Sequence, residues 1–194
     1  MSRKSSILFS GPDAPALKAL RTLHNQCADL TDQADIMTGK SFEDVCTFAT
    51  DFGELLENAI MFINKYPKIT NETTENFKNF YFIELENLNE KIDKVLVEKI
   101  PLVTPVFLKE NPKQCIDFLK IAYSVAISEY DKHKENPKEL DKGHNIVIAL
   151  EKMLNKIMNW KTIPTEIAKL HENVAELKED YEAAVKTKKH GKPH

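Results

Sequence analysis

The segment CIDFLKIAYSVAISEY, from Cys115 to Tyr130, decides the fold of this chain. On a helix, apolar side chains would surround most of it and leave one narrow polar line, formed by Asp117, Lys120, Ser124, Ser128 and Asp131. A helix with so little polar surface belongs inside a protein. A membrane-spanning helix needs about 20 apolar residues, and this segment is too short and too charged for that. We therefore expect other helices to cover it.

The composition also favours helices. The chain has 194 residues, which suits one domain, and it contains only 5 Gly and 9 Pro. Most of the prolines lie between segments with helical periodicity, as expected for long helices joined by short turns. We predict an all-α fold, an elongated up-and-down bundle of about six long helices around a buried central helix. The predicted helices cover residues 13–38, 42–65, 72–99, 112–134, 138–160 and 164–188.

Capping signals support these boundaries. Ser41 to Asp44 resembles a capping box, Thr70 or Asn71 can cap the third helix, and Asn111-Pro112 and Asn136-Pro137 place an N-cap residue before Pro. On the second helix the expected inward face is Phe42, Val45, Cys46, Ala49, Phe52, Leu56, Ala59, Ile60 and Ile63. The last helix carries a narrow, coiled-coil-like heptad seam that includes Leu170 and Leu177.

The regions outside the helices are short. We expect a flexible arm over residues 1–11, one bundle domain over 12–186 and a basic, disordered tail over 187–194. Between the third and fourth helices, Ile100 to Asn111 forms an apolar bend, in which Thr104-Pro105 opens a short helical turn that bears Val106, Phe107 and Leu108.

The charge pattern narrows the choice of partner. From Asp29 to Glu57 there are eight carboxylates and one basic residue, Lys40, so one face of the first two helices should be acidic. It is either a solvated face or a docking surface for a basic partner. Only two of the 27 basic residues are Arg, which disfavours a nucleic-acid partner because Arg is the residue best suited to read phosphates and bases.

No pattern for metal binding or catalysis is complete. Ferritin-like di-iron sites need two Glu-x-x-His pairs on neighbouring helices, and the nearest fragment is a single Asp141-Lys142-Gly143-His144. Cys46 and Cys115 have no His three or four residues away, and Cys27, three residues after His24, lies at an apolar helical position that suits a buried thiol. The five Gly are isolated, so neither a thiol nucleophile nor a phosphate-binding loop is indicated. We predict no metal and no cofactor. An enzyme with a site assembled from distant residues stays open but is disfavoured.

The expected compartment is the cytoplasm. The three Cys are an odd number at apolar helical positions, as expected for buried thiols under reducing conditions. The first residues contain no apolar core of the length that a signal peptide needs, and no segment reads as a transmembrane helix.

Two functional hypotheses follow. The first is a non-enzymatic helical bundle that binds another protein, as an adaptor, scaffold or effector, or that associates with itself. Its candidate surface is Asp29, Asp32, Asp35, Glu54, Glu57, Val106, Phe107, Leu108, Leu170 and Leu177. The alternative is a carrier of an apolar ligand or lipid, or a bundle that binds a membrane surface. Its candidate cavity is lined by Phe118, Tyr123, Met153, Met158 and Trp160, since Met and aromatic side chains adapt to irregular guests.

Overall fold

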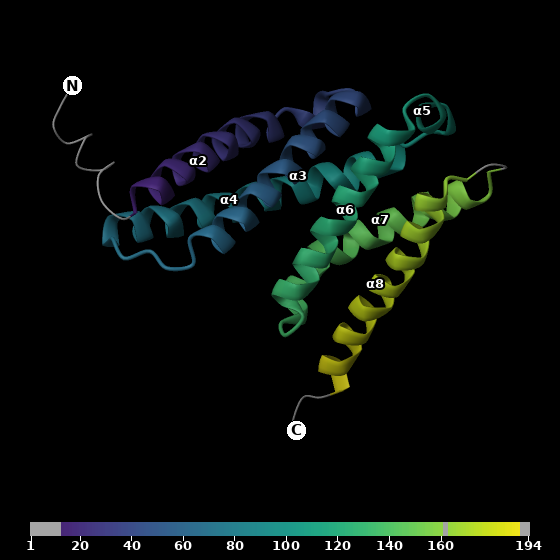
Figure 1. The fold of residues 1–194 in the computed structure, drawn as a ribbon. Helices are drawn as coiled ribbons and strands as arrows, with labels where there is room; N and C mark the ends of the chain where they lie inside the picture. Colours follow the sequence, from purple (N-terminus) through teal and green to yellow (C-terminus); the bar gives the residue numbers. More distant parts are fainter. Residues whose placement is uncertain (1–12, 161–162, 191–194) are drawn as a thin grey trace. The chain divides into compact units, whose positions relative to one another are not determined.

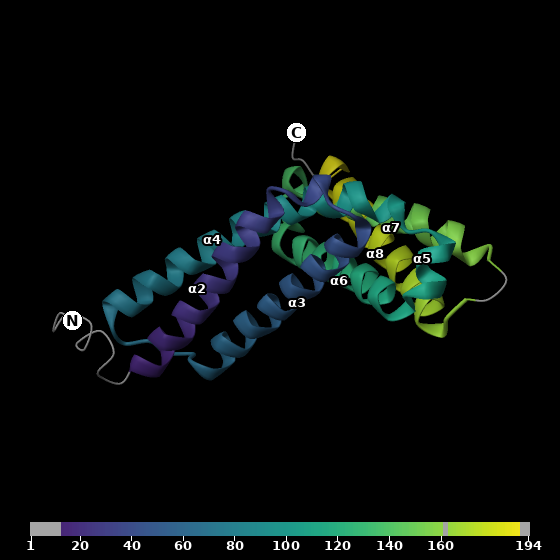
Figure 2. The same ribbon diagram turned by 90° about the horizontal axis from the view of Figure 1, so that it is seen from above.

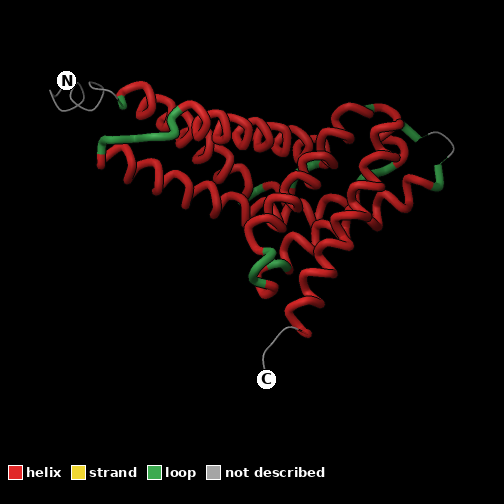
Figure 3. The backbone as a smooth tube through the Cα atoms, turned by 60° about the horizontal axis from the view of Figure 1, so that its bottom comes forward, coloured by secondary structure: helices red, strands yellow, loops and turns green. Residues whose placement is uncertain are grey.

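The computed structural model describes residues 13–160 and 163–190, and within these ranges it contains helices and loops but no strand (Figure 3). The prediction of an all-α bundle is confirmed. The α-helices are α2 (Ala14–Ala34), α3 (Phe42–Lys65), α4 (Glu72–Lys99), α5 (Pro105–Glu110), α6 (Pro112–His133), α7 (Asp141–Met158) and α8 (Thr165–His190). Three 3₁₀ turns accompany them: η1 (Met37–Gly39), η2 (Ile100–Leu102) and η3 (Pro137–Glu139).

Side-chain caps start several of these helices as the sequence indicates. The Asp44 N–H donates to Ser41 Oγ (3.2 Å), and the Thr74 N–H donates to Asn71 Oδ1 (3.0 Å). The turn predicted after Thr104 is α5, where the Phe107 N–H donates to Thr104 Oγ1 (3.1 Å). These bonds satisfy backbone donors that have no partner within the helix.

Several predicted boundaries were wrong. The first helix ends at Ala34, and η1 occupies the turn up to Gly39. Asn136-Pro137 opens η3 instead of a long helix, and α7 begins only at Asp141. Neither Asn111 nor Asn136 makes a capping hydrogen bond through its side chain, although Asn111-Pro112 opens α6 as expected, so the Asn-Pro pair does not determine how far the helix continues. At the other end α8 continues to His190, and the predicted arm over 1–11 and the end of the predicted tail, 191–194, lie outside the described residues.

The chain divides into two compact units. Unit 1 comprises Met1–Met37 and Thr50–Ile92, and unit 2 comprises Thr38–Ala49 and Asp93–His194. The helices α3 and α4 each contribute to both units. The expectation that residues 12–186 form a single domain stays a prediction.

Unit 1 consists of α2 with parts of α3 and α4 (Figures 1 and 2). His24 Nδ1 lies 2.7 Å from Glu84 Oε2 and joins α2 to α4. The Asp13 carboxylate accepts hydrogen bonds from the backbone N–H groups of Thr70 (3.1 Å) and Asn71 (2.5 Å), which holds the start of α4 against the start of α2. Buried leucines of α2 at Leu20, Leu23 and Leu30 complete this core.

The predicted inward face of α3 was partly wrong. Val45, Cys46, Ala49, Phe52 and Ala59 are buried as expected, but Ile60 and Ile63 are exposed, and Phe48, Leu55 and Phe62 are buried in addition. The sequence Ala59-Ile60-Met61-Phe62-Ile63 is apolar on every side of the helix. Periodicity therefore does not determine which of these side chains faces the core.

In unit 2, α6, α7 and α8 pack against one another (Figure 1). The helix α6 is its buried centre, and its buried side chains are Cys115, Ile116, Phe118, Leu119, Ala122, Val125, Ala126 and Glu129. The ring of Phe118 meets that of Phe42 edge to face, with 5.1 Å between centroids. Across both units, no helix among the described residues combines the length and the hydropathy that crossing a bilayer requires.

Candidate functional site

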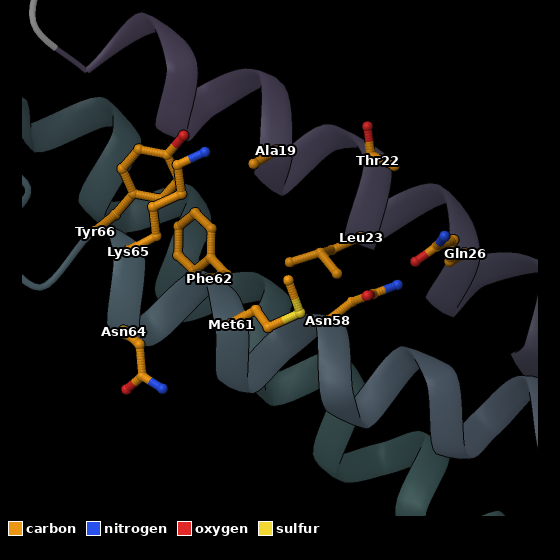
Figure 4. A pocket seen from close by; sticks show the side chains of 10 residues that line it. All are labelled: Ala19, Thr22, Leu23, Gln26, Asn58, Met61, Phe62, Asn64, Lys65 and Tyr66. Atoms are coloured by element: carbon orange, nitrogen blue, oxygen red, sulfur yellow. The ribbon is translucent and has the colours of Figure 1, made fainter.

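A groove lies between α2 and α3 in unit 1 (Figure 4). It has a volume of about 590 Å³. Its walls are Ala19, Thr22, Leu23 and Gln26 of α2, and Asn58, Met61, Phe62, Asn64 and Lys65 of α3 with the following Tyr66. Ala19 and Thr22 are too small to fill the space between the two helices, which leaves it open.

Apolar side chains form the bottom of this α2–α3 groove. Leu23 and Phe62 are buried, and Figure 4 shows both directed into the space between the helices. The Tyr66 ring packs on Phe62 with 5.2 Å between centroids, and Lys65 Nζ lies 5.6 Å from the centre of the Tyr66 ring. Met61 at the edge is 65% exposed. A flexible, exposed Met beside an apolar floor is suited to contact apolar side chains of varied shape.

The same part of α3 carries further exposed apolar surface. Ile60 and Ile63 flank Met61 in sequence and are 59% and 49% exposed. In total, six of the eight large apolar side chains that are exposed among the described residues belong to unit 1. Several exposed apolar side chains close together, as at Ile60, Met61 and Ile63, mark an interaction site more often than scattered single residues do.

The α2–α3 groove has an acidic continuation. Gln26 also lines a second cavity, of about 220 Å³, with Asp29, Leu30 and Gln33 of α2 and Asp51, Glu54 and Leu55 of α3. From the first cavity to the second, the residue numbers of the lining residues rise along α2 and fall along α3. The two cavities therefore follow one another along an antiparallel helix pair.

The structure places the predicted acidic residues of unit 1 in three settings. Asp29 and Glu54 line the acidic cavity. Asp32 and Glu57 are exposed on the same two helices but do not line it. Asp35 pairs with Lys91 of α4, whose Nζ lies 2.7 Å from its Oδ1.

The predicted apolar partner residues lie in unit 2 and are mostly covered. Val106 is exposed at the bend, but Phe107 packs on Phe42 with 4.8 Å between ring centroids, and Leu108 is buried. Leu170 and Leu177 are buried as well, because the seam of α8 packs on α6 and α7. The expectation that Leu108, Leu170 and Leu177 face a partner is therefore corrected: the fold itself uses them.

The predicted ligand cavity is not assembled as expected. Met153 lines a cavity of about 290 Å³ in unit 2 with Val97, Pro101, Asn145, Ile148, Ala149, Lys152 and Lys156. Phe118, Tyr123, Met158 and Trp160 are not among the residues that line it. Phe118 is fully buried in the core, and the other three are half-buried.

A buried polar cluster in unit 2 joins α6, α7 and α8. The Tyr181 hydroxyl donates to the Ala126 carbonyl oxygen (2.5 Å), and the Tyr181 ring stacks on His144 with 5.7 Å between centroids. Glu129 is buried beside them, and its Oε2 lies 3.4 Å from His133 Nε2. Burial raises the pKa of Tyr181, and the charge of Glu129 raises it further. The hydroxyl therefore stays protonated and can donate its hydrogen bond to Ala126.

Gly143 makes this cluster possible. A Cβ at this position would overlap the Tyr181 hydroxyl and lie 2.9 Å from Glu129 Cβ. Gly143 therefore lies where α7 closely approaches α6 and α8.

The thiols among the described residues are not suited to act as nucleophiles. Cys27, Cys46 and Cys115 are buried and not joined in disulfides, and burial raises the pKa of Cys46 and of Cys115 to about 12. A buried thiol with such a pKa is almost entirely protonated near neutral pH, and the thiolate is the reactive form. Within residues 13–160 and 163–190, no three His, Cys, Asp or Glu side chains are placed to hold a metal ion.

Comparisons with family models, with curated proteins and with solved structures find no match for this chain. Function is therefore argued from the site alone. The α2–α3 groove was missed at the sequence level, although the run from Ala59 to Ile63 holds more apolar side chains than one helix face can bury. That excess is the signal that could have located it.

Proposed function

We propose that this protein binds another protein, and that the α2–α3 groove of unit 1 receives an α-helical segment of the partner. The observation that carries this proposal is the apolar groove itself, with its exposed Met61 and the neighbouring Ile60 and Ile63. Amphipathic helices bind in such grooves by inserting apolar side chains spaced at three and four residues.

The dimensions support a helix as the guest. From Ala19 to Gln33 the two cavities follow 15 residues of α2, and at 1.5 Å per residue the first and the last of these are about 21 Å apart. A partner helix of about four turns would match this length. A cytoplasmic location belongs to the same proposal, because the three Cys side chains are buried thiols that are not joined in disulfides.

A labelled helical peptide with an apolar stripe and a neutral polar face tests the proposal. Fluorescence anisotropy with the full-length protein should show binding, and Met61→Glu should weaken it at least about tenfold, because a carboxylate at the edge of the groove must be desolvated. Ile83→Glu is the matched control, because Ile83 is 59% exposed on α4 and does not line the groove. Absence of binding, or an equal loss in both variants, would contradict the proposal.

A second candidate function, binding of an apolar ligand, is supported by the cavity beside Met153. Its wall combines apolar side chains with Lys152 and Lys156, a pattern that suits a small amphiphile with an anionic head. Native mass spectrometry of the gently purified protein, followed by titration with a fluorescent fatty acid, tests it. Binding should weaken in Ala149→Trp, because the larger side chain would fill the cavity. If the ligand binds this variant with unchanged affinity, its site lies outside this cavity.

A further inference from the structure

The α2–α3 groove is polar at one end and apolar at the other. Met61, Phe62 and Tyr66 surround the apolar end, whereas Asp51 and Glu54 of α3 face Asp29 of α2 at the acidic end. Unit 1 as a whole holds 8 Lys and Arg residues against 12 Asp and Glu residues, and unit 2 holds 19 against 18. The excess of negative charge therefore belongs to the unit that carries the groove.

The carboxylates of the acidic end have no cationic partner among residues 13–160 and 163–190. In the part of the chain that the structure describes, no Lys, Arg or His side chain pairs with Asp29, Asp51 or Glu54. Elsewhere in unit 1 carboxylates do have such partners: Asp35 pairs with Lys91, and Glu84 with His24. Asp29, Asp51 and Glu54 therefore place negative charge on both walls of the acidic end.

Gln26, where the two cavities meet, adds an unsatisfied acceptor. Its side-chain Oε1 is inaccessible to solvent, and none of the described residues donates a hydrogen bond to it. A buried carbonyl oxygen without a donor is unfavourable. If the Gln26 side chain turns toward the groove, a Lys or Arg side chain that enters the acidic end can donate an N–H group to this oxygen.

We infer that the partner helix is basic at one end and apolar along its face, with Lys or Arg side chains at the acidic end of the groove and apolar side chains at the Met61 end. This inference rests on the proposed helix-binding function and names the class of partner. Charge complementarity of this kind speeds association and selects the register in which a partner binds. The occupant is a segment of another protein, and a second copy of the chain and a lipid surface are outcomes of the test.

The test uses two labelled helical peptides with the same apolar stripe. One carries Lys at the polar positions of one end, and the other carries Gln there. The full-length protein should bind the Lys peptide about three- to tenfold more tightly at low salt, as expected for a few partly exposed charge pairs. The preference should shrink at about 0.5 M salt, because screening weakens exposed charge pairs.

A matched pair of variants locates the effect. Asp29→Asn/Glu54→Gln should remove the preference for the Lys peptide and leave the Gln peptide unaffected. Asp32→Asn/Glu57→Gln removes the same net charge three residues further along each helix, outside the groove, and should keep the preference. Equal binding of both peptides, or equal losses in both variants, would overturn the inference while the helix-binding function stands.

The remaining outcomes show whether something other than a basic helix of another protein occupies the α2–α3 groove. If neither peptide binds, the proposed function and this inference both fail. If light scattering shows a dimer that Met61→Glu dissociates, a second copy occupies the groove. If the protein binds vesicles that contain anionic lipid and this binding competes with the Lys peptide, the groove is a lipid site. Either of these last two results would overturn the inference.

Discussion

Unit 2 encloses most of its large apolar side chains, as at Phe118 and Tyr181, whereas unit 1 leaves Met61, Phe80 and Ile83 more than half exposed. Both units are built from amphipathic helices of the same chain. In unit 2 the faces of α6, α7 and α8 cover one another. In unit 1, α3 carries apolar side chains on more sides than α2 and α4 cover. A highly apolar segment such as that of α6 can therefore serve the fold alone, whereas apolar side chains that the neighbouring helices leave exposed, as on α3, mark a candidate interaction site.

The largest expected effect comes from opening the core of unit 2. Phe118→Ala should lower the free energy of unfolding by about 3–5 kcal/mol, because it removes a fully buried ring and leaves a cavity. The matched substitution Phe80→Ala in unit 1 should cost less than about 1 kcal/mol, since that ring is half exposed. Urea denaturation measures both. Equal losses would remove the contrast between the two units.

The close approach at Gly143 gives the next largest effect. Gly143→Ala should destabilise the protein by about 2–3 kcal/mol, because the new methyl group displaces Tyr181 and its hydrogen bond to Ala126. Gly39→Ala is the control, because a Cβ there meets nothing within 4 Å.

A double variant shows whether the clash is the cause. In Gly143→Ala/Tyr181→Phe the hydroxyl that meets the new methyl group is absent, so part of the lost stability should return. Strict additivity of the two single substitutions would contradict the packing explanation.

Much of unit 2, but little of the α2–α3 groove, could be predicted from the sequence. The caps at Ser41, Asn71 and Thr104 depend on neighbouring residues, so local pattern is enough to find them. Burial of Glu129 is different, because it depends on α7 and α8 closing over one polar residue of α6. No periodicity indicates such a contact, and none indicates that Gly143 would lie against Tyr181.

The errors in the candidate site have a similar physical origin. A narrow apolar seam, such as that at Leu170 and Leu177, has the same spacing whether it packs inside its own fold or faces a partner. The choice between Phe62 and Ile60 or Ile63 on α3 depends on the rotation of the helix against its neighbours, which the apolar run from Ala59 to Ile63 does not fix. Asp29 and Glu54 were recognised as acidic surface, but only the helix pairing places them on opposite walls of one groove.

Alkaline pH should weaken the folded state through its buried thiols. Cys46 and Cys115 of unit 2 have their pKa raised to about 12 by burial, whereas an unfolded thiol ionises near pH 9. Above pH 9 the unfolded state releases these protons first, so stability falls as pH rises towards 12. Each thiol contributes at most about 1.4 kcal/mol per pH unit.

Urea midpoints at increasing pH, under reducing conditions, measure this slope. The variant Cys46→Ala/Cys115→Ala should show a shallower decline than the parent protein. Cys27 of unit 1, whose pKa burial also raises, and the buried tyrosines contribute equally to both proteins and cancel in the comparison. Identical slopes would mean that the two thiols of unit 2 are accessible to water in the folded state.

The smallest expected effect is at the exposed apolar surface of unit 1. Ile60→Gln should change the free energy of unfolding by less than about 0.5 kcal/mol, and in the stabilising direction, because Gln is a better helix former than Ile and the side chain is already exposed. Ile92→Gln, at a buried position of the same unit, should cost several times more. If Ile60→Gln instead lost about 2 kcal/mol, Ile60 would be covered in solution, and the apolar surface beside the α2–α3 groove would belong to the fold and not to a partner.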